Sequence, residues 1–476
     1  MTKVLRVSPT YKCIGLCDAD LLDNGTRHPN LVLMKIAGFL LDNHILFELI
    51  LDPNVDLKRY DYVFMSCVFT FTKLPKFYLD AKGTPNESKF YKGGTGFYAN
   101  ISSISEYRKE REKDFTSLDN NEFLNALDNR RGGMKKKGID MARQMPYYHL
   151  YDDFVERQVK AGFKREKYKD YLQYSIGFLT RGCVRHCPFC VNKLENKVCR
   201  YSKLEWFVDN ERDEHGRLVR PYIYLWDDNF LASERTVWEP LLQELIDTKR
   251  PFQFRQGLDE RMLAQSPDGE LMAQMLAKSK YHGDFIFAFD NWRDRELIER
   301  ALKIWKKHNP KKGTKFYLFC GFKLKEHSHK KFYQDIWELF QRIRVLMSYG
   351  CVGYVMRHED YKKYEISNLY IQIARWCNQQ QFYKKMSFWE FCYRNQSYWE
   401  EKTKGITDRP QLKTFEEFEE DVNNGYYGDG EGQIKMCLTL RTVIRTLNKF
   451  PEHRDELLEM FNYKMENLIN PQLWQE

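Results

Sequence analysis

Three cysteines lie close together near the middle of the chain, at Cys183, Cys187 and Cys190. Their C-x₃-C-x₂-C spacing within one loop can bring three thiolates to three corners of an iron–sulfur cube. The fourth iron would then lack a protein ligand. An open position on a metal is what a substrate or cosubstrate needs for direct coordination, as at a catalytic zinc ion. The spacing therefore indicates a metal site that performs chemistry.

A structural zinc site is the main alternative for these cysteines. Such a site needs four enclosing ligands, and His186 is the candidate for the fourth. His186 directly precedes Cys187, which is awkward for a tetrahedral site that already uses the cysteines on both sides. No second C-x₂-C pair follows downstream, as a zinc ribbon would require. Three unrelated buried thiols are a further alternative, and the iron–sulfur interpretation is favoured over both.

The composition restricts the class of protein. A hydrophobic fraction of 42% with 15% aromatic residues allows sizeable cores and argues against wholesale disorder. The excess of 76 basic over 67 acidic residues tolerates an anionic partner without demanding one. The first residues resemble a strand and do not resemble a secretory leader. We therefore expect a cytoplasmic location, in which the cysteine thiols stay reduced. The early apolar stretch 31–41 contains Lys35 and is too short to span a bilayer, so no membrane partner is expected.

The segments around the cysteines predict an α/β fold. Six apolar runs are typical of strands and alternate with five helices, which describes a partial (β/α)₆ barrel of the TIM type. The predicted strands span residues 174–179, 222–226, 252–256, 284–289, 316–320 and 352–356. The predicted helices span residues 202–210, 234–247, 270–277, 293–307 and 333–349. In such folds the chemistry lies where strands end, and the cysteines directly follow the first strand.

The N-terminal region, residues 1–101, predicts a small parallel-sheet domain of the Rossmann or flavodoxin type, because strands and helices alternate. A helix is expected after His28-Pro29-Asn30. The strands are expected at residues 3–7, 46–51, 62–66 and 90–96.

Two other regions flank the predicted barrel, which occupies residues 170–359. Residues 102–169 form a polar stretch that we interpret as a partly helical linker or insertion with a mobile loop. Its most basic part, residues 130–138, is expected to be a solvated loop, with a phosphate-binding loop as the alternative. Residues 360–476 predict a mainly helical tail that covers the substrate.

The motif resembles the signature of the radical S-adenosylmethionine (AdoMet) superfamily. The third cysteine follows an aromatic residue, Phe189, and the motif follows a strand that opens a (β/α)₆ unit. In that superfamily AdoMet chelates the open iron of a [4Fe–4S] cluster, and electron transfer cleaves it to methionine and a 5′-deoxyadenosyl radical. The resemblance implies Cys183, Cys187 and Cys190 as cluster ligands and Phe189 near the adenine. It also implies a reductant such as flavodoxin or ferredoxin as a partner.

Other positions follow from the same resemblance. The second predicted strand ends in Asp-Asp-Asn-Phe, which departs from the usual Gly-Gly-Glu but is similar to cobalamin-type members. Asp227 and Asp228 would then bind the AdoMet amino group, with a turn that caps the next helix as the alternative. Gln256 or Arg261 would face the AdoMet carboxylate or the substrate. The alternative is that these residues only serve to start the helix that follows. Asp290 would bind the ribose hydroxyls.

The N-terminal region resembles the cobalamin-binding domain of one large subfamily, because Gly93-Gly94 follows a late strand. Cobalamin domains that supply a lower axial histidine carry Asp-x-His-x-x-Gly, and this chain has none. The loop after the first predicted strand instead holds residues 13–17, with a cysteine at each end. His28, the histidine nearest that loop, is expected to have a capping or packing role. We therefore expect the fold without a protein-supplied cobalt ligand and do not expect bound cobalamin.

The leading hypothesis is an enzyme that generates a radical and modifies a substrate that the sequence does not identify. The basic stretch and the aromatic tail lean slightly toward a nucleic acid or a peptide over a small metabolite. The alternative from another class is a non-catalytic iron–sulfur protein that transfers electrons or acts as a sensor. Such a protein would favour a fully ligated cluster, and three clustered cysteines argue against it.

Overall fold

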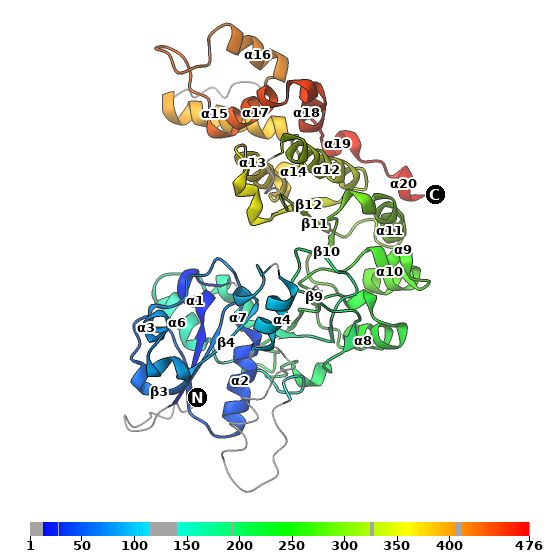
Figure 1. Ribbon diagram of the computed structural model, residues 1–476. Coiled ribbons are helices and arrows are strands. Elements are labelled where there is room, and N and C mark those ends of the chain that lie inside the picture. The colour runs from blue at the N-terminus through cyan, green and yellow to red at the C-terminus, as the bar shows by residue number, and fades with distance from the viewer. Residues whose placement is uncertain are drawn as a thin grey trace. The chain divides into compact units, whose positions relative to one another are not determined.

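The computed structural model describes residues 13–26, 28–101, 103–113, 140–192, 194–323, 328–404 and 412–475 (Figure 1). The protein is a mixed α/β molecule with parallel sheets, and it divides into two compact units, Met1–Arg255 and Gln256–Glu476. None of the helices in these ranges combines the length and the apolar composition needed to cross a bilayer. The predicted strand 3–7 and the basic stretch 130–138 lie outside the described residues.

The first unit opens with a four-stranded parallel sheet, which confirms the prediction of a parallel sheet in the N-terminal region. Its strands, in spatial order, are β2 (Phe47–Leu49), β1 (Cys13–Asp18), β3 (Tyr60–Ser66) and β4 (Phe90–Gly93). Because β1 and β3 run parallel, the loops that follow them leave the same carboxyl edge of the sheet.

The prediction that residues 13–17 form a loop is wrong, since they form the central strand β1. Alternate residues of β1 face opposite sides of the sheet: Ile14 and Leu16 pack into one core, whereas Cys13 and Cys17 pack into the other. A Cβ at Gly15 would lie 2.9 Å from Ile50 Cδ1. The glycine marks close packing within a strand.

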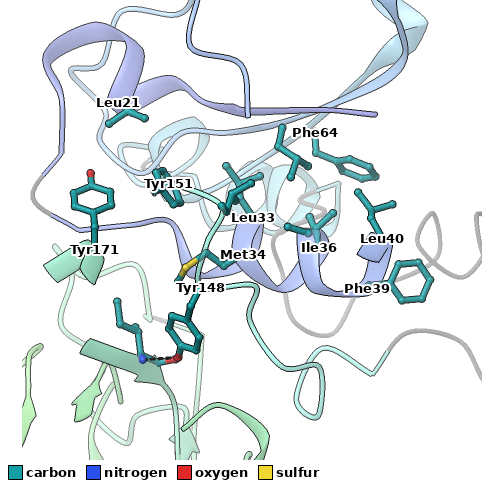
Figure 2. Close-up of a cluster of buried hydrophobic side chains, with 14 of the residues drawn as sticks. Leu21, Leu33, Met34, Ile36, Phe39, Leu40, Phe64, Tyr148, Tyr151 and Tyr171 are labelled. Atoms are coloured by element: carbon teal, nitrogen blue, oxygen red, sulfur yellow. Dashed lines mark hydrogen bonds between the residues drawn. The ribbon is translucent and has the colours of Figure 1, made fainter. Parts of the chain in front are cut away.

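Helices cover both faces of this sheet. Helix α2 (Leu31–Asp42) begins after Asn30, whose side chain accepts a hydrogen bond from the Leu33 N–H, as the sequence predicts. Its buried side chains meet Phe64 of β3 in one core (Figure 2). Helix α3 (Lys76–Ala81) supplies Phe77 and Tyr78 to the core on the other face.

Part of the stretch 102–169 packs into the core of the first unit, through buried side chains such as Tyr148, Tyr151 and Val155. The same stretch contains helices α4 (Ile104–Glu112) and α6 (Asp152–Lys160), and helix α7 (Lys169–Leu172) begins at its last residue. The buried Tyr148 lies beside Met34 of α2, and its hydroxyl accepts a hydrogen bond from the Ile176 N–H at 2.8 Å and donates to the Phe207 carbonyl at 2.7 Å (Figure 2). This tyrosine joins the N-terminal sheet to the sheet that follows.

That second sheet is parallel, with the order β5 (Tyr174–Gly177), β8 (Tyr222–Leu225) and β9 (Phe252–Phe254). Helix α8 (Arg235–Asp247) connects β8 to β9. The prediction of a helix at residues 202–210 is wrong, because only a short 3₁₀ turn, η5 (Leu204–Trp206), forms there. Ser202 donates to the Ala142 carbonyl instead of capping a helix, and tertiary contacts of the buried Phe207 fix the backbone.

The second unit holds a separate parallel sheet with the order β10 (Phe285–Ala288), β11 (Thr314–Cys320) and β12 (Val352–Arg357). Helices α11 (Arg295–His308) and α12 (His329–Ser348) connect these strands. The described residues after β12 form helices and no further strand. These helices are α13 (Asn368–Cys377), α14 (Gln380–Tyr383), α15 (Phe388–Lys404), α16 (Phe415–Asn423), α17 (Leu438–Lys449), α18 (Arg454–Phe461), α19 (Met465–Leu468) and α20 (Gln472–Gln475).

Candidate metal centre in the cysteine loop

The three clustered cysteines lie in one loop of the first unit, residues 182–198, which we call the cysteine loop. Strand β6 (Thr180–Arg181) leads into it and strand β7 (Cys199–Arg200) leaves it, and the two pair antiparallel at its base. The loop therefore begins shortly after β5 ends, at the carboxyl edge of the β5-β8-β9 sheet. This is the edge at which parallel α/β folds carry their chemistry.

Gly182 makes the sharp turn that starts the loop. Its φ is +99°, and a Cβ there would lie 2.2 Å from the Lys197 carbonyl oxygen on the returning strand of the loop. Only glycine fits this combination of a positive φ and a close backbone approach. The turn places Cys183 directly beside the end of the neighbouring strand.

The thiols are hydrogen-bonded by nitrogen donors. The Arg185 N–H donates to Cys183 Sγ at 3.3 Å, and the Asn192 N–H donates to Cys190 Sγ at 3.4 Å. Cys183 is buried, and burial raises the pKa of the half-buried Cys190. N–H donors of this kind stabilise sulfur ligands in iron–sulfur sites.

The three thiols of the cysteine loop are donors of the type that iron–sulfur groups use. Across the described ranges, no three His, Cys, Asp or Glu side chains converge as a preformed metal site does. His186, the candidate fourth ligand of a zinc site, is exposed, and Phe189 is half-buried.

Asp227 and Asp228 follow β8 and contact the beginning of the cysteine loop. Asp227 is only 1% exposed, and burial raises its pKa to about 6. It accepts hydrogen bonds from the N–H groups of Leu179 and Thr180. Asp228 accepts one from the Gly182 N–H at 2.9 Å. The structure thus brings both predicted residues to the start of the cysteine loop, where Asp227 holds the backbone that leads into the loop and Asp228 holds its first residue.

The other predicted residues lie in the second unit. The Arg261 guanidinium forms ion pairs with Asp259 at 2.7 Å and Asp294 at 3.0 Å. Asp290 follows β10 and accepts a hydrogen bond from the Phe319 N–H at 3.3 Å, and burial raises its pKa. Gln256 is exposed. Arg261 and Asp290 are close enough for the arginine charge to influence the carboxyl group.

Helix α4 supplies two contacts that sequence reasoning missed. The buried Tyr107 hydroxyl donates to the Val191 carbonyl, directly after the third cysteine, and Arg111 forms an ion pair with Glu195. Tyr107 and Arg111 are four residues apart, so they lie on the same helical face. The sequence feature that could have predicted this helix is Ser103, whose side chain caps it by accepting a hydrogen bond from the Glu106 N–H. The prevailing polarity of residues 102–169 concealed it.

The segment before α2 reaches the carboxyl ends of β8 and β9. His28 Nδ1 lies 2.5 Å from Asp170, and its Nε2 lies 3.0 Å from the guanidinium of Arg255. Its ring packs edge-on against Trp226, with centroids 5.2 Å apart. His28 therefore connects the N-terminal sheet to the edge of the sheet that carries the cysteine loop.

Comparison with known proteins adds no family. Neither the protein-family models nor the curated proteins match this chain.

Proposed function

We propose that the protein is a radical AdoMet enzyme that holds a [4Fe–4S] cluster on Cys183, Cys187 and Cys190. The observation that carries the proposal is the C-x₃-C-x₂-C spacing in a glycine-started loop at the carboxyl edge of a parallel sheet. Hydrogen bonds to the sulfurs of Cys183 and Cys190 support it.

The cluster, when bound with AdoMet, would supply one electron that cleaves the cosubstrate to methionine and a 5′-deoxyadenosyl radical. The chain's own part is to ligate three irons, leave the fourth open, and exclude water from the radical. His28 and helix α4 support the last task, because they bring the segment between β1 and α2 beside the β8–β9 edge and the segment after β4 beside the cysteine loop. A radical near such a covered edge meets its intended hydrogen first.

The finer architecture is also a proposal. The sheets β5-β8-β9 and β10-β11-β12 are both parallel, and their strands follow in chain order. We propose that they are the two halves of one partial (β/α)₆ barrel. In that arrangement Phe189, Gln256, Arg261 and Asp290 would contribute to the AdoMet and substrate sites, with flavodoxin or ferredoxin as the reductant.

The N-terminal sheet is proposed to have the cobalamin-domain fold without a protein ligand to cobalt. His28, the histidine nearest β1, is engaged by Asp170 and Arg255, which supports this proposal. Cobalamin that co-purifies at one equivalent, and is lost in His28→Ala, would overturn it.

Replacement of the three cysteines tests the cluster. The triple change Cys183→Ala, Cys187→Ala and Cys190→Ala should remove the iron and the brown colour while the protein stays folded. The matched control is Cys199→Ala, an exposed thiol at the base of the same loop. That control should retain the iron of the wild type after anaerobic reconstitution. Zinc in the purified wild type, with no iron taken up during reconstitution, would contradict the proposal.

A further inference from the structure

The residues after β8 meet the backbone that leads to the first cysteine. Strands β5 and β8 are parallel neighbours, with Gly177 opposite Leu225, so their carboxyl ends lie side by side. The chain leaves β5 toward Cys183 and leaves β8 into Asp227 and Asp228. Two carboxylates from one strand end can therefore act on the loop that starts at the other.

Both carboxylate oxygens of Asp227 accept hydrogen bonds from the residues that lead into the cysteine loop. Oδ2 accepts a hydrogen bond from the Leu179 N–H at 3.1 Å, and Oδ1 accepts from the Thr180 N–H at 2.6 Å and the Thr180 hydroxyl at 2.7 Å. The carboxylate is buried, so water cannot replace it. Removing it would leave two backbone donors without an acceptor, which such groups rarely tolerate.

Asp228 holds the turn itself. Its Oδ2 accepts a hydrogen bond from the N–H of Gly182, the residue with positive φ that starts the cysteine loop. It also pairs with Arg181 at 3.3 Å, and that guanidinium lies over the Phe178 ring, 4.3 Å from its centroid. The side chain therefore fixes both the turn and the residue before it.

Capping of the following helical turn does not explain the positions of Asp227 and Asp228. The 3₁₀ turn that follows, η6 (Phe230–Ala232), begins after Asn229, and no side chain caps it. Asn229 instead donates its Nδ2 to Cys183 Sγ at 3.4 Å. Three consecutive residues after β8 thus all contact the cysteine loop or its beginning.

We infer that Asp227 and Asp228 are positioning residues that keep the cysteine loop folded before any metal arrives, and that Asn229 orients the Cys183 thiol. The inference rests on the proposed function only for the identity of the metal group that the loop receives. It departs from a role of the two carboxylates as ligands of the AdoMet amino group, because both oxygens of Asp227 and Oδ2 of Asp228 accept hydrogen bonds from the backbone at the start of the cysteine loop.

Alkylation of the metal-free protein tests the inference without any cofactor. The buried Cys183 should react slowly with iodoacetamide in the wild type, as measured by mass spectrometry of its peptide. Asp228→Asn should raise this rate about tenfold, because it weakens a charge-assisted hydrogen bond to the turn. Its melting temperature should stay near that of the wild type, since the effect is local. Glu234→Gln, an exposed acid after η6, is the matched control and should leave the rate unchanged.

Iron uptake and AdoMet binding separate the two roles. After anaerobic reconstitution, Asp227→Asn and Asp228→Asn should hold less iron per chain than the wild type. Wild-type alkylation and iron content combined with weakened AdoMet binding would overturn the inference. If Asp227→Asn fails to fold, Asp228→Asn decides alone, because its carboxylate is 12% exposed. A wild type that binds zinc would refute the proposed function and leave the alkylation result intact.

A spectroscopic measurement tests Asn229. A hydrogen bond to a ligating sulfur stabilises the reduced cluster. Asn229→Ala should therefore shift the reduction potential of the reconstituted cluster to a more negative value, as followed by electron paramagnetic resonance during titration. A potential equal to that of the wild type would overturn its role.

Discussion

Single buried carboxylates at the ends of strands have consequences that can be measured. Asp18 ends β1, and it accepts hydrogen bonds from the Leu21 N–H at 3.2 Å and the Tyr151 hydroxyl at 2.9 Å. Burial raises its pKa from 3.8 to about 7, although both hydrogen bonds favour the ionised form. Desolvation therefore outweighs hydrogen bonding at this position.

The raised pKa of Asp18 predicts a pH-dependent contribution to stability. Between pH 3.8 and about 7 the folded protein keeps the proton that the unfolded chain has lost. Raising the pH through this window therefore favours unfolding. Urea unfolding at several pH values should show that Asp18→Asn gains stability relative to the wild type as the pH rises. Asp52→Asn, an exposed control, should show no such trend, and a constant difference for Asp18→Asn would contradict the assignment.

Gly182 predicts a second effect at the scale of one residue. Gly182→Ala should lower the free energy of unfolding by about 2–5 kcal/mol, because a left-handed backbone and a clash add together. Gly216→Ala is the matched control, with φ +74° and nothing within 4 Å of the added Cβ. It should cost only about 1–2 kcal/mol. Equal losses in urea unfolding would show that the approach to Lys197 is not tight.

At the scale of elements, local patterns predicted several strands well, missed the central strand β1, and predicted one helix that does not form. Strands β3, β8 and β12 lie within two residues of their expected positions, because each carries a continuous apolar run of strand length. Residues 202–210 carry a helical pattern but do not form an α-helix. The packing of Phe207 and the hydrogen bond from the Tyr148 hydroxyl to its carbonyl determine the backbone there instead. Such a contact joins residues far apart in the chain, so no local pattern reveals it.

Helix α4 gives a prediction at this scale. Tyr107→Phe removes the hydrogen bond to Val191 and leaves the ring packing intact, so it should cost about 1 kcal/mol. Hydrogen exchange should also accelerate in the segment after Cys190. Tyr398→Phe, whose parent side chain is 61% exposed, should change neither quantity. Wild-type exchange in Tyr107→Phe would show that α4 does not hold the cysteine loop.

At the scale of the whole molecule, the sequence predicted strands and their parallel character but not their grouping. A buried apolar run indicates a strand but does not indicate which other strand it pairs with. The division at Arg255 and Gln256 therefore could not be predicted from these runs. For the candidate site, the cysteine spacing alone was enough to predict the cysteine loop. The contacts of Asp227 and Tyr107 could not be predicted, because they depend on which strand ends and helices lie next to that loop in the fold.

The most direct test of the central proposal is the fate of AdoMet in the reconstituted protein. The wild type, loaded anaerobically with iron and sulfide and reduced with dithionite, should convert AdoMet to 5′-deoxyadenosine and methionine in equal amounts. The variant without Cys183, Cys187 and Cys190 should form neither product above background. A wild type that carries a reducible [4Fe–4S] cluster yet leaves AdoMet intact would contradict the proposal and favour a non-catalytic electron-transfer or sensor protein.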